Sequence, residues 1–377
     1  MKNIFLILFF SFLLVSCQDK KPAPDALPKF EWKAAICAPV GYEASANATY
    51  IFGNNHNNSF SADSPYIYTG WGVYGSVISG GSTNIPTEVK INWLSKAEGK
   101  YYKATVKIDT LKIKQLIAKG CGVNEYTKKR EQYSFIMSGV APGGVAAVWL
   151  GKDIETVEMV GWAKGEEDLN PPMISEIDYR DEVKKYKEKT FLGRTDDKNA
   201  EELVDIDFVA KHGIIYGSWD YYPKKYNWQP VVLSNKGYEI DNYGFIINPV
   251  TGGRDELSNY DFYDDRKPHL PATYTWEEVQ KFNSFKGQRT LPSFIGFWWS
   301  FNNAKDGTQA KLMLPLKELY NYFEKGFTKK DGSKGNYTKL VFEVNKNKKV
   351  VIWLFGDLEH KVKITEYQSD EKDGQEL

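Results

Sequence analysis

The sequence has 377 residues, of which 42% are hydrophobic and 15% aromatic, so it can form two ordinary domains and is not a disordered chain. Lysine and arginine together number 49, as do aspartate and glutamate, and this balance excludes the strongly basic character typical of nucleic-acid binding. We therefore expect a globular protein that does not bind nucleic acid.

The chain begins with one lysine and a short apolar run, which predict an export signal rather than a transmembrane helix. The run ends in Leu14-Val15-Ser16-Cys17, which resembles a bacterial lipobox, where the cysteine thiol is acylated and the chain is cleaved on its amino side. An ordinary signal peptide followed by a chance cysteine is the alternative. We predict a signal peptide over residues 1–16 and acyl chains on Cys17 that anchor the protein in a membrane.

Residues 17–29 form a charged, proline-rich stretch that predicts a tether without a core of its own. Gln18 follows the lipobox cysteine, where an aspartate would favour retention at the inner membrane of a Gram-negative bacterium. The expected location is therefore the cell envelope, as an outer-membrane lipoprotein on either the periplasmic or the surface face.

Four blocks of similar sequence recur in the same order in the two halves of the chain, which predicts an internal duplication. The paired blocks are Ala38–Tyr42 with Tyr222–Tyr226, Trp71–Gly81 with Tyr243–Gly253, Asn84–Ser95 with Thr290–Phe301, and Tyr133–Val160 with Tyr337–Ile364. We expect two homologous domains over residues 30–165 and 206–368, a charged linker over 166–205 and a tail over 369–377. The second domain carries an insertion at about residues 254–288.

Both domains show the same local patterns. Alternating apolar residues around Val89, Ile91 and Trp93 predict a strand, and the next alternating run completes a hairpin. Helical spacing follows over residues 110–119 and 315–325, with Gly120 and Gly326 as C-caps. A second hairpin contains Trp149 or Trp353, which we assign to core packing. The predicted fold class is α+β, with two homologous domains, each a mainly antiparallel β-sheet with one packed α-helix.

The linker is rich in charged residues. A helix between Ile174 and Lys189 fits its pattern, but the composition favours a solvated connector.

Several repeated positions resemble a family of bacterial lipoproteins that is classed only as a domain of unknown function. The matching positions are Pro39, Tyr42, Pro86, Trp93, Trp149 and their partners in the second copy. The resemblance implies motifs that are structural rather than catalytic. It also implies an immunity role beside phospholipase toxins of contact-dependent or type VI secretion systems. The doubled domain departs from the usual single form.

No pattern in the sequence is typical of catalysis. The four histidines are scattered, and no two stand at the spacing of metal ligands. No serine lies in a Gly-x-Ser-x-Gly motif. We expect a protein that is not an enzyme and that has no metal and no cofactor. Cys37 and Cys121 are either joined by a disulfide in the oxidising envelope or buried as thiols.

Aromatic residues in polar segments of the second copy predict a surface for a partner. They are Tyr221, Tyr222, Tyr226, Trp228, Tyr260, Tyr263, Tyr274 and Trp276. Packing of the insertion onto its own domain is the alternative. The expected function is a membrane-anchored, non-catalytic binding lipoprotein, with a protein toxin as partner. A glycan-binding surface lipoprotein of a nutrient-uptake system is the second possibility.

Overall fold

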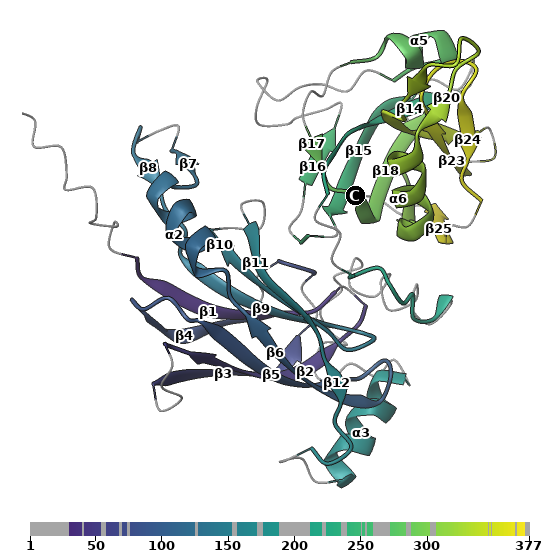
Figure 1. The fold of residues 1–377 in the computed structure, drawn as a ribbon. Coiled ribbons are helices and arrows are strands. Elements are labelled where there is room, and N and C mark those ends of the chain that lie inside the picture. Colours follow the sequence, from purple (N-terminus) through teal and green to yellow (C-terminus); the bar gives the residue numbers. More distant parts are fainter. Residues whose placement is uncertain are drawn as a thin grey trace, which may run out of the picture.

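The structure is a computed structural model that describes residues 30–373 with internal gaps (Figure 1). The gaps are residues 40, 54–57, 68–69, 74–75, 125–126, 153–156, 172–175, 188–211, 221–223, 235–239, 250, 253–254, 259–271, 284–287, 302–306, 346, 348 and 366–367. The predicted signal peptide, Cys17, the tether and the last residues of the tail lie outside the described residues. The described part is mostly β-structure with a few short helices.

The N-terminal half, residues 30–220, contains two five-stranded sheets. Sheet 1 has the order β11-β10-β9-β1-β4 and sheet 2 the order β12-β6-β5-β2-β3. The strands are β1 (Trp32–Cys37), β2 (Ala44–Ile51), β3 (Ser59–Ile67), β4 (Ser76–Ser82), β5 (Glu88–Ser95), β6 (Lys100–Lys107), β9 (Phe135–Ala141), β10 (Val145–Gly151), β11 (Val157–Lys164) and β12 (Glu166–Glu167). Helix α2 (Thr110–Lys119), the pair β7 (Gly122–Val123) and β8 (Arg130–Glu131), and helix α3 (Glu176–Lys187) complete this half.

The C-terminal half, residues 224–373, also contains two main sheets. Sheet 3 has the order β14-β22-β23-β24 and sheet 4 the order β16-β15-β18-β19-β25. The strands are β14 (Gln229–Ser234), β15 (Ile240–Pro249), β16 (Asp255–Ser258), β18 (Pro292–Phe301), β19 (Thr308–Met313), β22 (Lys339–Val344), β23 (Val350–Phe355), β24 (Lys361–Lys363) and β25 (Gln368–Asp373). The short elements are β13 (Tyr226–Asn227), β17 (Gln288–Arg289), β20 (Phe327–Thr328), β21 (Lys334–Gly335), α5 (Trp276–Lys281) and α6 (Leu316–Lys325).

The strands of the two halves pair in a corresponding order. In each half the first strand, β1 or β14, runs parallel to β9 or β22, and all other neighbours in the main sheets are antiparallel. Trp32 donates its indole hydrogen to the carbonyl of Asn84 at 2.9 Å, and Trp228 donates to the carbonyl of Thr290 at 3.1 Å. The prediction of one sheet per domain is wrong, because each half has two main sheets.

In each half the hydrophobic core is enclosed between the two main sheets. Side chains from sheets 1 and 2 meet in one buried cluster that includes Tyr50, Trp93 and Val148. In the C-terminal half, Phe245 and Phe297 of sheet 4 stack and contact Phe342 of sheet 3. Strands such as β10 are buried at every position, as expected for a strand covered on both faces, so their sequence shows no alternation.

The outer face of sheet 1 is covered by a later segment of the chain. Ile214 and Trp219 pack there with Trp149, and Tyr42 contacts Trp219 edge-to-face at 4.8 Å between ring centroids. The sequence assigned residues from 206 onwards to the second domain. The packing instead joins residues 212–220 to the N-terminal half, because the apolar outer face of sheet 1 needs a cover.

The hairpins and the two domain helices follow the sequence pattern. Asp109 caps α2 by accepting a hydrogen bond from the backbone of Lys112, and α2 buries Ile113 and Ile117. Helix α6 buries Leu316, Leu319 and Phe323. Gly120 and Gly326 follow these helices with positive φ angles of 74° and 59°, as predicted for C-cap glycines.

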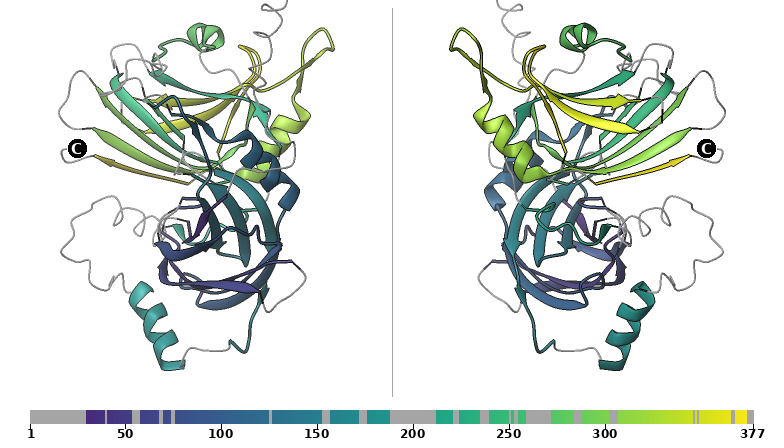
Figure 2. Two further views of the ribbon diagram at one scale, coloured as in Figure 1. Left: turned by 90° about the vertical axis from the view of Figure 1, so that its left-hand side faces the viewer. Right: turned by 90° about the vertical axis from the view of Figure 1, so that its right-hand side faces the viewer.

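The linker helix α3 lies at the end of the N-terminal half remote from the C-terminal half (Figures 1 and 2). It is held by hydrogen bonds, since Tyr186 donates to the carbonyl of Gly41 and Ser45 donates to Glu182 at 3.2 Å. The segment thus forms the helix that the pattern allowed, and the described side chains of this helix are exposed or half-buried. The contacts are polar, which is why the apolar pattern of the helix did not indicate them.

Two of the four repeated blocks occupy corresponding strands and two do not. Asn84–Ser95 with Thr290–Phe301 contains β5 and β18, and Tyr133–Val160 with Tyr337–Ile364 contains the hairpins β9–β10 and β22–β23. Tyr243–Gly253, however, lies largely in β15, which pairs with β18 as β2 pairs with β5. Its match to the segment around β4 is therefore shifted. The match of Ala38–Tyr42 to Tyr222–Tyr226 is shifted as well, because the first segment follows β1 whereas the second precedes β14.

Candidate partner-binding surface

The structure describes four of the eight predicted partner-binding aromatic residues. Tyr221, Tyr222, Tyr260 and Tyr263 lie outside the described residues. Trp228 is a core residue with an exposed fraction of 2%, so its assignment to a binding surface is wrong. Its place directly before β14, on the side that faces the core, buries it. Tyr226, Tyr274 and Trp276 are half-buried and remain candidates.

Tyr226 packs against α6 and forms a polar contact at the end of that helix. Its ring contacts Phe323, and its hydroxyl donates to the carboxylate of Glu324, which also pairs with Lys224 at 2.6 Å. Burial, followed by the hydrogen bond to Glu324, raises the pKa of the Tyr226 hydroxyl. The hydrogen bond from Lys224, followed by the one from Tyr226, lowers the pKa of Glu324. This arrangement holds Tyr226 in place against its own domain.

Trp276 begins α5 and lies on the outer face of sheet 3. It meets Trp353 edge-to-face, with ring centroids 5.5 Å apart and planes at 82°, and stacks on the buried ring of Phe355 at 5.7 Å. The ammonium of Lys361 lies 4.5 Å from the centroid of the Trp276 ring. Trp353 donates its indole hydrogen to Glu343 at 2.7 Å. We call Trp276, Trp353, Glu343 and Lys361 the indole surface.

The helix that carries Trp276 is fixed by local contacts. Thr275 is its N-cap and accepts a hydrogen bond from the backbone of Glu278, whose carboxylate in turn accepts from the backbone of Tyr274. Thr273, two residues before the N-cap, forms an isolated parallel bridge with Leu233. These contacts attach the end of the predicted insertion to sheet 3. The sequence assigned Trp353 wholly to the core, but its ring is half-buried.

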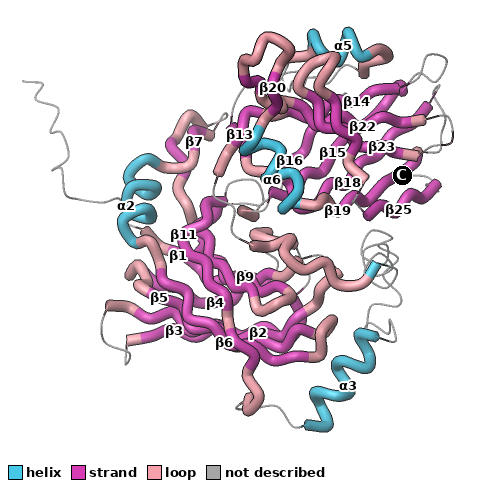
Figure 3. The backbone as a smooth tube through the Cα atoms, turned by 45° about the vertical axis from the view of Figure 1, so that its right-hand side comes forward, coloured by secondary structure: helices cyan, strands magenta, loops and turns pink. Residues whose placement is uncertain are grey.

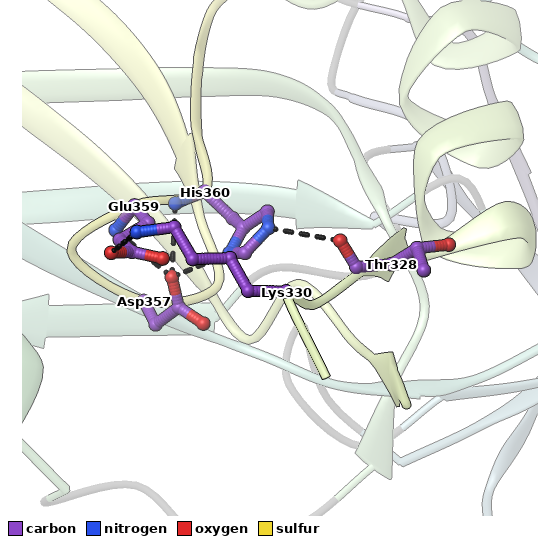
Figure 4. Close-up of polar contacts among 5 residues, drawn as sticks. All are labelled: Thr328, Lys330, Asp357, Glu359 and His360. Carbon is purple, nitrogen blue, oxygen red and sulfur yellow. Dashed lines mark hydrogen bonds and ion pairs between the residues drawn. The ribbon is translucent and has the colours of Figure 1, made fainter. Parts of the chain in front are cut away.

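A second polar cluster is centred on His360, in the turn that leads into β24 (Figure 4). The Nδ1 atom of His360 lies 2.7 Å from the carboxylate of Asp357, and its Nε2 atom lies 3.2 Å from the carbonyl oxygen of Thr328. The ring stacks on Phe327 with centroids 4.1 Å apart. Lys330 and Glu359 pair across the same two segments at 2.5 Å. The cluster therefore joins the β20–β21 hairpin to the turn before β24.

Glycines make room for this stack. A Cβ atom on Gly335 or Gly356 would lie 2.2 Å or 2.1 Å from the ring of Phe327. Burial alone would raise the pKa of Asp357, but hydrogen bonds from the His360 side chain and from the backbone of Glu359 and His360 hold it below its ordinary value. Sequence reasoning gave this cluster no role, although the spacing Asp-x-x-His over Asp357–His360 was visible.

Cys37 and Cys121 are not joined by a disulfide in the structure. Cys37 is fully buried on the outer face of sheet 1, whereas Cys121 packs against the core between sheets 1 and 2. The two side chains thus pack in different buried clusters. Of the alternatives that the sequence left open, the structure has reduced thiols, of which Cys37 is buried and Cys121 half-buried.

Within residues 30–373 as described, no helix combines the length and the apolar composition that crossing a membrane requires. In the same described part, no three histidine, cysteine or acidic side chains are gathered as a set of metal ligands.

The comparisons with known proteins identify a family but no function. Residues 17–217 match the family described as "Protein of unknown function (DUF2931)", and no curated protein and no solved structure matches the chain. The matched region ends within the segment around Ile214 that covers sheet 1, so it spans the N-terminal half with its cover. Because the match includes more than half of the 377 residues, this chain belongs to the DUF2931 family.

Proposed function

We propose that the chain is a lipid-anchored, non-catalytic binding protein of the cell envelope that neutralises a secreted toxin by covering part of its surface. The lipobox at Cys17 supports the anchor, and the resemblance to lipoproteins found beside phospholipase toxins supports the immunity role. Acyl chains on Cys17, followed by the tether, would hold both halves close to the membrane that such a toxin attacks.

The indole surface is the observation that carries the proposal of a protein partner. Two half-buried indole rings lie side by side, with an acidic and a basic side chain at their edges. Protein interfaces combine such an aromatic centre with a charged rim, and tryptophan is enriched among the residues that dominate binding energy. The Trp276 ring is supported from below by Phe355, so it is ordered before a partner arrives.

A glycan ligand is the less favoured function. Sugar rings stack on flat platforms, for which two indoles would have to lie close to one plane. The planes of Trp276 and Trp353 instead meet at 82°. A protein loop can fill the angle between two such rings more readily than a flat sugar can.

We also infer that the two halves are copies of one domain. The corresponding order of strand pairing, the parallel first strand and the matching hydrogen bonds of Trp32 and Trp228 support this origin. The indole surface distinguishes the second copy from the first. Its residue Glu343 aligns with Gly139 of the first copy.

The experiment measures whether this protein inhibits a purified type VI phospholipase effector. We expect equimolar full-length protein to abolish lipid hydrolysis. The double substitution Trp276→Ala and Trp353→Ala should weaken inhibition at least about tenfold, as for loss of central interface residues. Tyr216→Ala, at an exposed aromatic residue of the other half, is the matched control and should inhibit normally. Unchanged lipase activity combined with retention on a polysaccharide column would contradict the proposal and favour the glycan alternative.

The anchor has a separate test. The Cys17→Ala variant should incorporate no labelled fatty acid and should leave the membrane fraction on cell fractionation. Retention of the fatty-acid label in this variant would refute lipidation at Cys17.

A further inference from the structure

A lysine and a glutamate are buried together at one end of sheet 2. Lys96 and Glu43 have exposed fractions of 2% and 4%. The antiparallel register places Ala44 opposite Ser95, so the next residue on each strand also faces its partner, and the backbone N–H of Lys96 donates to the carbonyl of Glu43 at 3.1 Å. The Nζ atom of Lys96 is in direct contact with the Oε1 atom of Glu43.

Helix α3 covers this pair and brings a second carboxylate. The Oε2 atom of Glu182 lies 3.6 Å from the Nζ atom of Lys96 and accepts a hydrogen bond from Ser45 at 3.2 Å. Tyr186, one helical turn later, donates to the carbonyl of Gly41 and fixes the helix over the pair. The cluster therefore holds one amine and two carboxyl groups, and Tyr42 and Leu94 beside it in sequence are themselves buried.

The surroundings favour the uncharged form of Glu43. Burial raises the pKa of Glu43, and the nearby charge of Glu182 raises it further, although the charge and hydrogen bond of Lys96 act in the opposite direction. A buried ion pair costs several kcal/mol of desolvation, which conversion of the two charged groups into one neutral amide would relieve. The neutral amine is the nucleophilic form of lysine.

We propose that Lys96 and Glu43 become joined by an intramolecular amide bond. The Nζ atom of Lys96 attacks the side-chain carboxyl carbon of Glu43, the C–N bond forms, and one C–O bond breaks to release water. Glu182 takes the proton that the amine loses and returns it to the departing hydroxyl, so it acts as the general base and then as the general acid. One ammonium and one carboxylate thus become one amide and one water molecule, without an oxidant or a co-reactant.

Proximity makes the reaction feasible at this pair. Groups held in contact by a rigid fold react at effective concentrations of about 10⁵ M or more, far beyond those of free solutes. The pairs Lys107–Glu88 and Lys330–Glu359 also touch, but their lysine side chains are 77% and 83% exposed. Water stabilises the charged forms there, so these pairs remain salt bridges. Burial under α3 and the second carboxylate distinguish Lys96.

The test is peptide mapping of the full-length, lipidated protein after extraction in detergent and digestion with trypsin. We expect residues 91–100 to appear uncleaved at Lys96 and attached to residues 34–90, with a total mass about 18 Da below the sum of the two peptides, the mass of one water. Recovery of Ile91–Lys96 and Ala97–Lys100 as the main, unmodified products would overturn the proposal.

Two substitutions distinguish loss of the amide-forming reaction from loss of the folded structure. Glu182→Gln keeps both joined residues and the hydrogen-bonding shape of the helix, and it should yield mostly unlinked peptides from protein with native circular dichroism. Glu88→Gln, at the pair whose lysine Lys107 is exposed, is the matched control and should remain fully linked between Lys96 and Glu43. Complete linkage in Glu182→Gln would exclude the assigned role of the second carboxylate.

Discussion

Trp149 of sheet 1 donates its indole hydrogen to the backbone carbonyl of Thr251, 102 positions later in the turn after β15. The indole lies between two glycines. A Cβ atom on Gly139 or on Gly252 would lie 2.5 Å from an atom of its ring system. Trp71 packs against the same indole, with its ring at 90° to that of Trp149. The tryptophan that the sequence assigns to the core of the first domain therefore also contacts the C-terminal half.

This contact predicts that Gly252→Ala destabilises the protein. The substitution forces a methyl group against the indole and places alanine at a φ of 91°. We expect a loss of about 2–3 kcal/mol of unfolding free energy in chemical denaturation. Gly213→Ala is the control, since Gly213 has a φ of 75° and no atom within 4 Å of the added Cβ, and it should cost only about 1 kcal/mol. Equal losses would show that backbone strain, rather than the indole contact, dominates.

Trp32 and Trp228 should respond alike to substitution, because each is buried and donates one hydrogen bond to a carbonyl before the next long strand. Replacing either by alanine removes a large core side chain and should cost about 3–5 kcal/mol. Replacing either by phenylalanine keeps most of the volume, and the carbonyl loses its donor, at a cost of about 1–3 kcal/mol. Thermal unfolding of the four variants checks this. A difference of several kcal/mol between matched variants would contradict an equivalent role.

Asp357 predicts a pH dependence of stability. Its pKa in the folded protein is lower than in the unfolded chain, where it is about 3.9. A lowered pKa contributes stability that is present above the unfolded value and is lost as the pH falls through the folded value. The unfolding free energy of the wild type should therefore exceed that of Asp357→Asn at neutral pH. The gap should narrow as the pH falls below about 4. A gap that stays constant down to pH about 2 would contradict this role.

The cysteines should differ in reactivity. Burial raises the pKa of the Cys37 thiol to about 12, so almost none of the reactive thiolate is present at neutral pH. We expect a maleimide to modify the half-buried Cys121 in the folded protein and to reach Cys37 only after unfolding. Mass spectrometry of peptides after timed labelling distinguishes the two. Failure of both cysteines to react in the denatured, unreduced protein would instead indicate a disulfide.

Local sequence determined most of the secondary structure of this protein. Alternation around Ile91 placed β5, helical spacing placed α2 and α6, and the glycines that follow these helices ended them. These features depend on contacts between residues close in sequence and on one buried face. The strongest repeated blocks, which contain β5, β9 and β10, fall on strands with corresponding places in the sheets of the two halves.

The tube view shows what the sequence alone left open, namely the pairing of strands that are far apart in the chain (Figure 3). The parallel pairing of β1 with β9 joins residues about a hundred positions apart, and the division into two sheets follows from it. Strands covered on both faces carry no alternation from which their neighbours could be inferred. Only this tertiary arrangement shows that Trp228 is buried, because the residues on either side of it in the sequence are typical of an exposed loop.

The clusters with chemical interest depended on tertiary structure even more. Glu43 directly precedes β2, Lys96 directly follows β5, and Glu182 lies in the linker helix, and each is an ordinary charged residue in its own segment. Their burial arises only when α3 lies over the end of sheet 2. The sequence thus determined the periodic strands and the helices that end at glycine, which are local properties. Only the tertiary structure decided which side chains are buried together, because burial depends on which segments, far apart in the sequence, pack against one another.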